Sequence, residues 1–190
     1  MSNESENSNL TWDDDLGDID EEVSEEAIKE AESMGKVAVG KYFCECVDSQ
    51  PRQKDFKEYS CIVTNLRWNV LKVLEIDGVA VEGDEGEAYE GRAIFDDVAL
   101  YAPAEKDGMR KRRILIAKRV GLIGGSSDKI TKTMWKTGII GKKVIINYIE
   151  EGYIPKGSTV ERKIRKVAFD GYESADGMEI TDQTPDINDI

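Results

Sequence analysis

Histidine is absent from the 190-residue chain, and cysteine and proline are scarce. Without histidine, the commonest general base near neutral pH is missing, which argues against most hydrolytic and nucleophilic enzymes. A membrane-spanning helix needs a run of about 18 apolar residues, and the sequence contains none. The first ten residues lack the basic and apolar segments of a signal peptide, which favours a cytoplasmic location.

The three cysteines, Cys44, Cys46 and Cys61, fit neither a disulfide framework nor a zinc site. Their number is odd, and the first two have a C-x-C spacing. A structural zinc site commonly uses four Cys or His ligands. We therefore expect buried strand residues, and predict no metal and no cofactor. A metal site built from carboxylates alone stays open, although Asp96 and Asp97 are adjacent and would point to opposite faces of a strand.

Charge is distributed unevenly along the chain, whose net charge is −13. Residues 1–35 carry 13 acidic residues and one basic residue, and residues 173–190 carry six acidic residues and no basic one. Residues 36–172 carry 25 basic and 20 acidic residues, a net charge of +5. A basic body suits a nucleic-acid partner. The acidic ends either keep the protein soluble, or compete with nucleic acid for the body and recruit partners.

This charge pattern predicts three parts. Residues 1–35 read as an acidic, largely disordered segment, with helical spacing over 20–34. Residues 36–172 read as one nucleic-acid-binding domain, and residues 173–190 as an acidic disordered tail.

Alternation of apolar and polar residues predicts a mainly β domain with minor α content. The expected strands cover about residues 36–48, 59–76, 92–101, 142–150 and 159–172. Broken alternation near residues 70–72 indicates a bulge in the second strand. A helix over 109–123 would pack with Ile114, Ala117, Val120 and Leu122, and a shorter helix or turn would follow over 127–136.

Five strands with a helix between the third and the fourth is the order of an OB-fold barrel, here flanked by acidic tails. A generic small β-barrel or sandwich would give similar strand runs. OB-folds bind single strands through the outer face of the middle strands and through the loops after the first and fourth strands. Cations contact the phosphates there, and aromatic rings stack on the bases.

The candidate DNA-binding residues are cations and aromatics of these loops, of the strands and of the helix. They are Lys41, Arg52, Lys54, Phe56, Lys57, Tyr59, Arg67, Arg92, Phe95, Arg110, Lys111, Arg113, Lys142, Tyr153, Lys156, Lys163 and Arg165. The basic run in the helix could equally be a solvated face, with Arg113 among its exposed residues. A tryptophan in a strand is usually packed, so we expect Trp68 in the core, whereas Phe95 fits either a packed or a stacking role.

The order of short motifs over residues 36–172 resembles phage-encoded OB-fold single-stranded-DNA-binding proteins of recombination and replication gene clusters. The motifs are G-x-Y at 40–42, a long apolar strand ending at Gly78, Y-x-G-R at 89–92, the pair at 95–96, and Gly141-Lys142. The resemblance implies a non-enzymatic protein that binds single-stranded DNA with little sequence preference during phage DNA replication or recombination. The acidic N-terminal segment and the very basic helix depart from the family's pattern.

The chain ends in TPDINDI, which resembles the acidic tips of bacterial and phage single-strand binders, with Ile190 where Phe is more usual. The resemblance implies that the tip recruits replication or recombination proteins. The residues concerned are Asp182, Asp186, Ile187, Asp189 and Ile190.

The sequence therefore predicts a single-stranded-DNA-binding protein without a catalytic centre. Two other classes stay open: an acidic interaction module or DNA mimic that binds a basic protein, and a nuclease that uses carboxylate-bound metal. A mimic should be acidic over its folded body, whereas this body is basic. The oligomeric state, the choice between DNA and RNA, and the binding-site size are left open.

Overall fold

The computed structural model describes residues 37–55, 60–101, 107–125 and 128–178. The chain divides into two compact units at Met34 and Gly35, and every described residue belongs to the second unit. The candidate residues Phe56, Lys57 and Tyr59 lie outside the described residues, as do the acidic N-terminal segment and the tail positions from Asp182 to Ile190. Among the described helices, none is long and apolar enough to cross a membrane.

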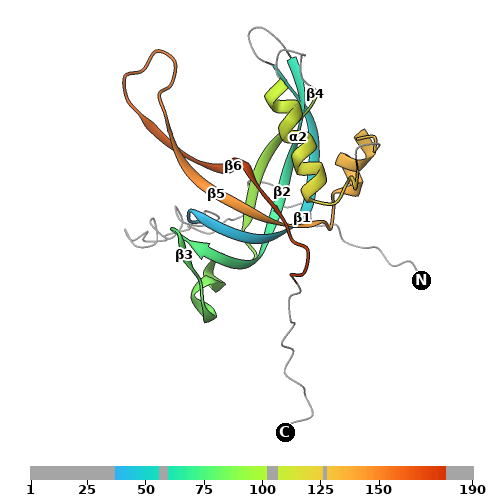
Figure 1. The fold of residues 1–190 in the computed structure, drawn as a ribbon. Coiled ribbons are helices and arrows are strands. Elements are labelled where there is room, and N and C mark those ends of the chain that lie inside the picture. Colours follow the sequence, from blue (N-terminus) through green and yellow to red (C-terminus); the bar gives the residue numbers. More distant parts are fainter. Residues whose placement is uncertain (1–36, 56–59, 102–106, 126–127, 179–190) are drawn as a thin grey trace, which may run out of the picture. The chain divides into compact units, whose positions relative to one another are not determined.

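Within these described residues, six antiparallel strands form one sheet (Figure 1). They are β1 (Gly40–Asp55), β2 (Ser60–Ile76), β3 (Val79–Ala80), β4 (Ala93–Tyr101), β5 (Lys143–Tyr153) and β6 (Arg162–Ser174). The hydrogen-bonded order is β3-β2-β1-β5-β6, and β4 pairs with the first half of β2. The helical segments are η1 (Gly83–Tyr89), α2 (Asp107–Arg119) and the π-helical turn η3 (Met134–Gly138). The predicted mainly β architecture is confirmed.

Alternation along β2 determines which face of the sheet is packed. Leu66, Trp68 and Val70 are buried in the core, whereas Arg67 between them is exposed on the opposite face. The expected packed role of Trp68 is thus confirmed. The ladder with β1 skips Leu71, so the bulge expected near residues 70–72 is confirmed as well.

Strand β1 is longer than the sequence indicated. It continues to Asp55, because its second half pairs residue by residue with β2 from Ser60 to Arg67. Arg52 and Lys54 therefore lie in a strand, and their placement in a polar loop was wrong. The short strand β3 and the turn η1 were not predicted as separate elements.

Helix α2 packs largely as predicted. Ala117 and Val120 are buried and Leu122 packs against the core, which confirms their expected side, whereas Ile114 is exposed and Ile116 is buried instead. The helix ends at Arg119, two residues before Gly121, whose φ of 69° is the left-handed conformation that glycine adopts at little cost.

The sheet is open between β4 and β6, which share no ladder within the described residues. Helix α2 lies along this opening (Figure 1), and its arginines reach both strands. Arg112 donates to the carbonyl oxygens of Asp97 on β4 (3.3 Å) and Phe169 on β6 (3.2 Å). Unpaired edge carbonyls need donors when water is excluded. The arginines thus supply some of the hydrogen-bond donors that a neighbouring strand would supply. We call this region, where α2 lies between the edges of β4 and β6, the β4–β6 seam.

Two further arginines of α2 extend the seam. Arg113 donates to the carbonyl oxygens of Ala99 (3.2 Å) and Leu100 on β4. Arg119 donates to the carbonyl oxygen of Tyr172 and, at 2.6 Å, to the carboxylate of Asp170 on β6.

Candidate nucleic-acid interface

Two hollows lie beside β4 and β6, and together we call them the β4–β6 groove. The first has a volume of about 620 Å³ and is lined by Phe95, Tyr148, Ile164 and neighbouring residues. The second has a volume of about 280 Å³ and is lined by Asp97, Phe169 and neighbouring residues. Phe95 lines the first hollow and Asp97 lines the second, and the two residues lie two positions apart on β4, where side chains share one face.

The groove presents two aromatic rings to solvent. Phe95 is 57% exposed and Phe169 is 59% exposed, although both belong to strands of the sheet. Arg67 stands directly opposite Phe95 in the β2–β4 ladder, so the two side chains are neighbours on the outer face. The guanidinium of Arg112 lies 5.9 Å from the centre of the Phe169 ring. Each exposed ring therefore has an arginine beside it. Of the two roles that the sequence left open for Phe95, the packed one is wrong, because the ring is exposed.

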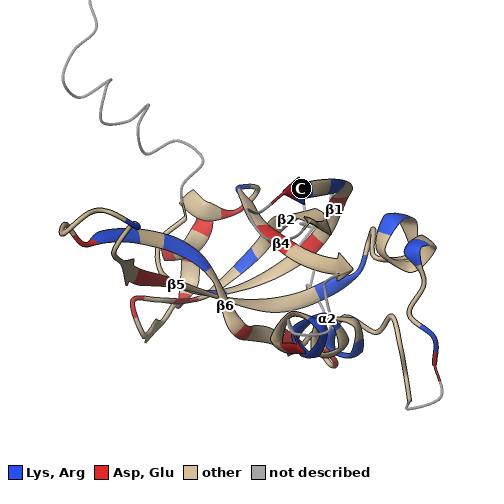
Figure 2. Cartoon of the chain, turned by 90° about the horizontal axis from the view of Figure 1, so that it is seen from above, with Lys and Arg blue, Asp and Glu red and all other residues tan. Residues whose placement is uncertain are grey.

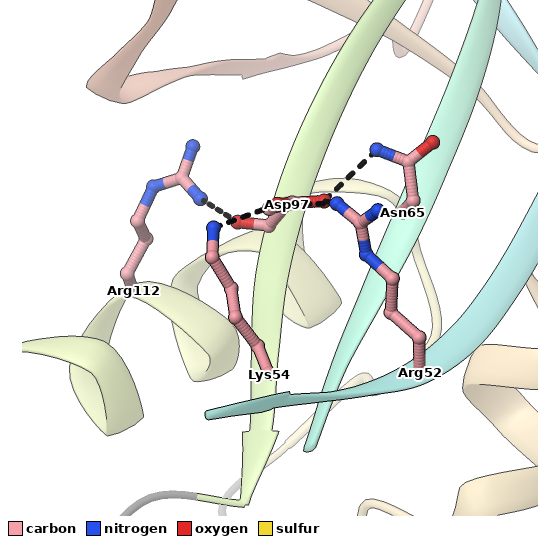
Figure 3. A network of polar contacts seen from close by, with 5 residues as sticks. All are labelled: Arg52, Lys54, Asn65, Asp97 and Arg112. Carbon is pink, nitrogen blue, oxygen red and sulfur yellow. Dashed lines mark hydrogen bonds and ion pairs between the residues drawn. The ribbon is translucent and has the colours of Figure 1, made fainter. Parts of the chain in front are cut away.

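A polar network centred on Asp97 lies at the second hollow (Figure 3). One Arg52 nitrogen is 3.0 and 2.9 Å from the two carboxylate oxygens, and the Lys54 ammonium is 3.3 Å from one of them. The Asn65 amide donates to the other oxygen at 2.9 Å. Burial raises the pKa of Asp97, but hydrogen bonds from Asn65, Arg52 and Lys54 outweigh it and hold the pKa below its ordinary value.

The cations of β6 that line the first hollow are paired with a carboxylate of β5. Glu150 accepts from Lys163 at 2.8 Å and from Arg165 at 3.5 Å. Arg165 also donates to the carbonyl oxygen of Val37 at 3.1 Å. The hydrogen bond from Lys163 is the main reason why the pKa of Glu150 is lowered. Lys and Arg residues gather along this stretch of β6 and on α2 (Figure 2).

The structure brings six of the predicted DNA-binding residues to the groove or directly beside it. They are Arg52, Lys54, Arg67, Phe95, Lys163 and Arg165.

Other predicted cations have partners elsewhere. Lys41 pairs with Glu173 at 3.1 Å, and Lys111 pairs with Asp107 at 2.7 Å within α2. Arg92 lies over the ring of Tyr89, with its guanidinium carbon 5.1 Å from the ring centre.

The remaining described candidates line neither hollow of the groove. Arg110 is exposed on α2, and Tyr153 and Lys156 are exposed at the tip of the β5–β6 hairpin. Lys142 lines a separate pocket together with Lys118 and Lys143.

Arg113 requires a correction. Its expected place on the solvated side of the helix was wrong, because its guanidinium is half-buried against the β4 carbonyls. Burial lowers the pKa of Arg113.

Sequence reasoning missed three groove residues, Arg112, Tyr148 and Phe169. Arg112 lies in the run Arg110–Arg113, where nothing in the local sequence separates it from its neighbours. Phe169 follows buried Val167 by two residues, which predicts a packed ring. The β5–β6 ladder, however, passes from Val167 directly to Tyr172, so alternation breaks between them and the ring of Phe169 is exposed.

The two adjacent aspartates serve separate networks, as their alternation predicted. Asp96 contacts Arg112 and Tyr172, whereas the Asp97 carboxylate contacts Arg52, Lys54 and Asn65. Among the described residues, no three His, Cys, Asp or Glu side chains are placed to hold one metal ion. The cysteines are free and buried, which confirms the expectation of small buried strand residues.

No protein-family model and no curated protein sequence matches this chain. The groove and its side chains are therefore the features of this protein that indicate a function.

Proposed function

We propose that the described domain binds single-stranded DNA along the β4–β6 groove. The observation that carries the proposal is the pair of solvent-exposed rings, Phe95 and Phe169, each with an arginine beside it on a strand or helix of the same groove. Large exposed apolar side chains in a hollow indicate a binding site. Rings that alternate with cations suit a polymer of bases and phosphates.

In this proposal the rings bind bases and the cations bind phosphates. Phe95 and Phe169 stack on bases, which is tolerant of sequence because every base has a π-face. The phosphates contact cations on three strands, namely Arg52, Lys54, Arg67, Lys163 and Arg165. Several of these cations already have carboxylate partners, so binding exchanges one ion pair for another. We therefore expect moderate affinity and a marked dependence on salt.

The strand order supports an assignment of the finer fold, which we propose to be a variant of the OB-fold. Strands β1, β2, β4, β5 and β6 correspond to its five strands, with α2 between the third and the fourth. The outer face of β2 and β4 is then the face that OB-folds use for oligonucleotides. The seam would be the open side of a partly open barrel.

We extend the proposal to the cellular role that the sequence resemblance implies. The protein would protect single strands during phage DNA replication or recombination, and it would act without catalysis. The acidic tail that contains Asp186 and Asp189 would recruit the proteins of those processes. Loss of co-purification with a replication or recombination protein after removal of residues 179–190 would support the tail's role, and unchanged co-purification would contradict it.

Fluorescence anisotropy of labelled oligo-dT tests the central claim. Full-length protein is titrated at low and at moderate salt, and the double variant Phe95→Ala/Phe169→Ala is titrated in parallel. We expect salt-sensitive binding by the wild type and a large loss in the variant. Absence of binding at low salt would refute the function. Equal binding by both proteins would place the DNA elsewhere on the domain.

A further inference from the structure

At the edge of the second hollow, three donors converge on the carboxylate of Asp97, which lines that hollow together with Lys54. Arg52 and Lys54 come from β1, Asn65 comes from β2, and all three reach the side chain of Asp97 on β4 at 2.9–3.3 Å (Figure 3). A guanidinium, an ammonium and an amide are also the groups that bind the oxygens of a phosphate. The geometry is therefore that of an anion site whose present occupant belongs to the protein.

Solvent exposure makes this site available to an external anion. The side chains of Arg52 and Lys54 are 56% and 46% exposed, so solvent reaches both cations. An exposed ion pair is weak, because water and salt screen it. The cations can therefore turn from Asp97 to a phosphate at small cost.

We propose that Arg52, Lys54 and Asn65 form a phosphate subsite and that Asp97 is a built-in competitor for it. When a phosphate enters, the long side chains of Arg52 and Lys54 turn toward it. Asp97 stays on β4 and repels the phosphate as a like charge. Asp97 thus weakens binding and keeps the subsite from holding anions tightly. The part of this inference that concerns DNA rests on the proposed function, whereas the phosphate subsite itself does not.

The exchange predicts that removal of the competitor tightens binding. Asp97→Asn keeps the size of the side chain and removes its charge. In full-length protein, we expect roughly fivefold tighter binding of oligo-dT at low salt, which corresponds to the about 1 kcal/mol of an exposed ion pair. The slope of log K against log salt should become steeper by about 0.7, the value for one more phosphate contact with a single strand.

Asp170→Asn is the matched control. It changes the net charge equally and also removes a carboxylate from an arginine, Arg119, at 2.6 Å. Arg119 lines neither hollow of the groove. The oligo-dT binding curve of Asp170→Asn should therefore match that of the wild type. The double variant Arg52→Ala/Lys54→Ala should weaken binding. If Asp170→Asn tightened oligo-dT binding equally, or if Asp97→Asn did not tighten it, the role of Asp97 as a competitor would be overturned. Unchanged binding by the double variant would overturn the subsite.

A second measurement separates this inference from the proposed function. Inorganic pyrophosphate is titrated into full-length protein, and the backbone amide NMR shifts of residues 52, 54 and 65 are followed. We expect saturation at a lower pyrophosphate concentration in Asp97→Asn than in the wild type, and no saturable shift when Arg52→Ala/Lys54→Ala is added to that variant. This result would uphold the subsite even if oligo-dT did not bind. Absence of a saturable shift in Asp97→Asn would overturn it.

Discussion

The hydroxyl of Tyr172 donates a hydrogen bond to Asp96 at 2.7 Å, and the oxygen that accepts it also accepts from Arg112 at 2.8 Å. One carboxylate oxygen thereby joins β6, β4 and α2. The side chains of Arg112 and Asp96 are 13% and 11% exposed, so this ion pair is shielded from solvent. Burial raises the pKa of Asp96, and the charge of Arg112 opposes that shift. The contact holds the seam together beneath the proposed DNA groove.

Replacement of Arg112 by Ala should destabilise the domain strongly. The change leaves the carboxylate of Asp96 buried without its cation and removes two donors to edge carbonyls. Loss of one partner from a buried pair costs about 3–5 kcal/mol. Urea unfolding followed by tryptophan fluorescence measures the change. Lys111→Ala removes a neighbouring cation whose ion pair is exposed, and it should leave the unfolding midpoint almost unchanged. Similar midpoints for the two variants would contradict the role of the seam.

Replacement of Tyr172 by Phe removes the hydrogen bond that β6 donates to the same carboxylate oxygen of Asp96. The ring keeps its edge-on contact with Trp68, whose centroid is 5.6 Å away, and only the hydroxyl is lost. We expect a loss of about 1 kcal/mol in the free energy of unfolding. A double-mutant cycle with Arg112→Ala should show coupling, because both groups share one acceptor. Additive effects would contradict the shared site.

Stability should depend on Asp97 in a pH-dependent way. Its pKa in the folded state lies below the ordinary value, so its ion pairs stabilise the fold above the unfolded-state pKa. That contribution is lost as the pH falls through the folded-state pKa. Because the network is largely solvent-accessible, we expect under about 1 kcal/mol. The free energies of unfolding of wild type and Asp97→Asn should therefore differ at pH 7 and converge below pH about 4. A difference that grows on acidification would have the wrong sign.

Single substitution of each exposed ring should distinguish base stacking from non-specific hydrophobic binding. Phe95→Ala and Phe169→Ala should each weaken oligo-dT binding by about 1–3 kcal/mol, the cost of losing one stacked base. Their thermal midpoints should change little, because both rings are exposed. Tyr101→Ala is the control, since this exposed aromatic also lies on β4 but lines a different pocket. A loss for Tyr101→Ala as large as for the phenylalanines would argue against the groove.

The cysteines should be unreactive in the folded protein. Burial raises the pKa of Cys46 to about 12 and raises that of Cys44 as well. The thiolate is the reactive form, and all three thiols are buried. Ellman's reagent at pH 8 should therefore detect no thiol in native protein and three in urea. Rapid reaction of one thiol without denaturant would contradict the packing around it.

Strand patterns in the sequence predicted most of the sheet, because alternation reports directly which side of a strand is packed. Residues 66–70 are an example, with Trp68 buried and Arg67 exposed. The second half of β1 was missed because its polar residues and Pro51 suggest a loop. Its strand structure comes from pairing with β2, which local propensity does not report.

The groove was only partly predictable for a similar reason. Arg67 and Phe95 were identified because each lies on a regular strand, and their ladder partners follow from the register. Phe169 was missed because the ladder is irregular there. The functions of Arg112 and Arg113 depend on which carbonyls lack a strand neighbour, and that is decided by tertiary structure.

The arginine contacts along the seam also bear on how the protein behaves at high concentration. An unpaired strand edge is a template for the strand of another chain, and such pairing leads to aggregation. On the facing edges of β4 and β6, guanidinium groups of α2 already bond several of the carbonyls that an incoming strand would need. The same helix that joins the two edges therefore makes them poor partners for intermolecular β-pairing.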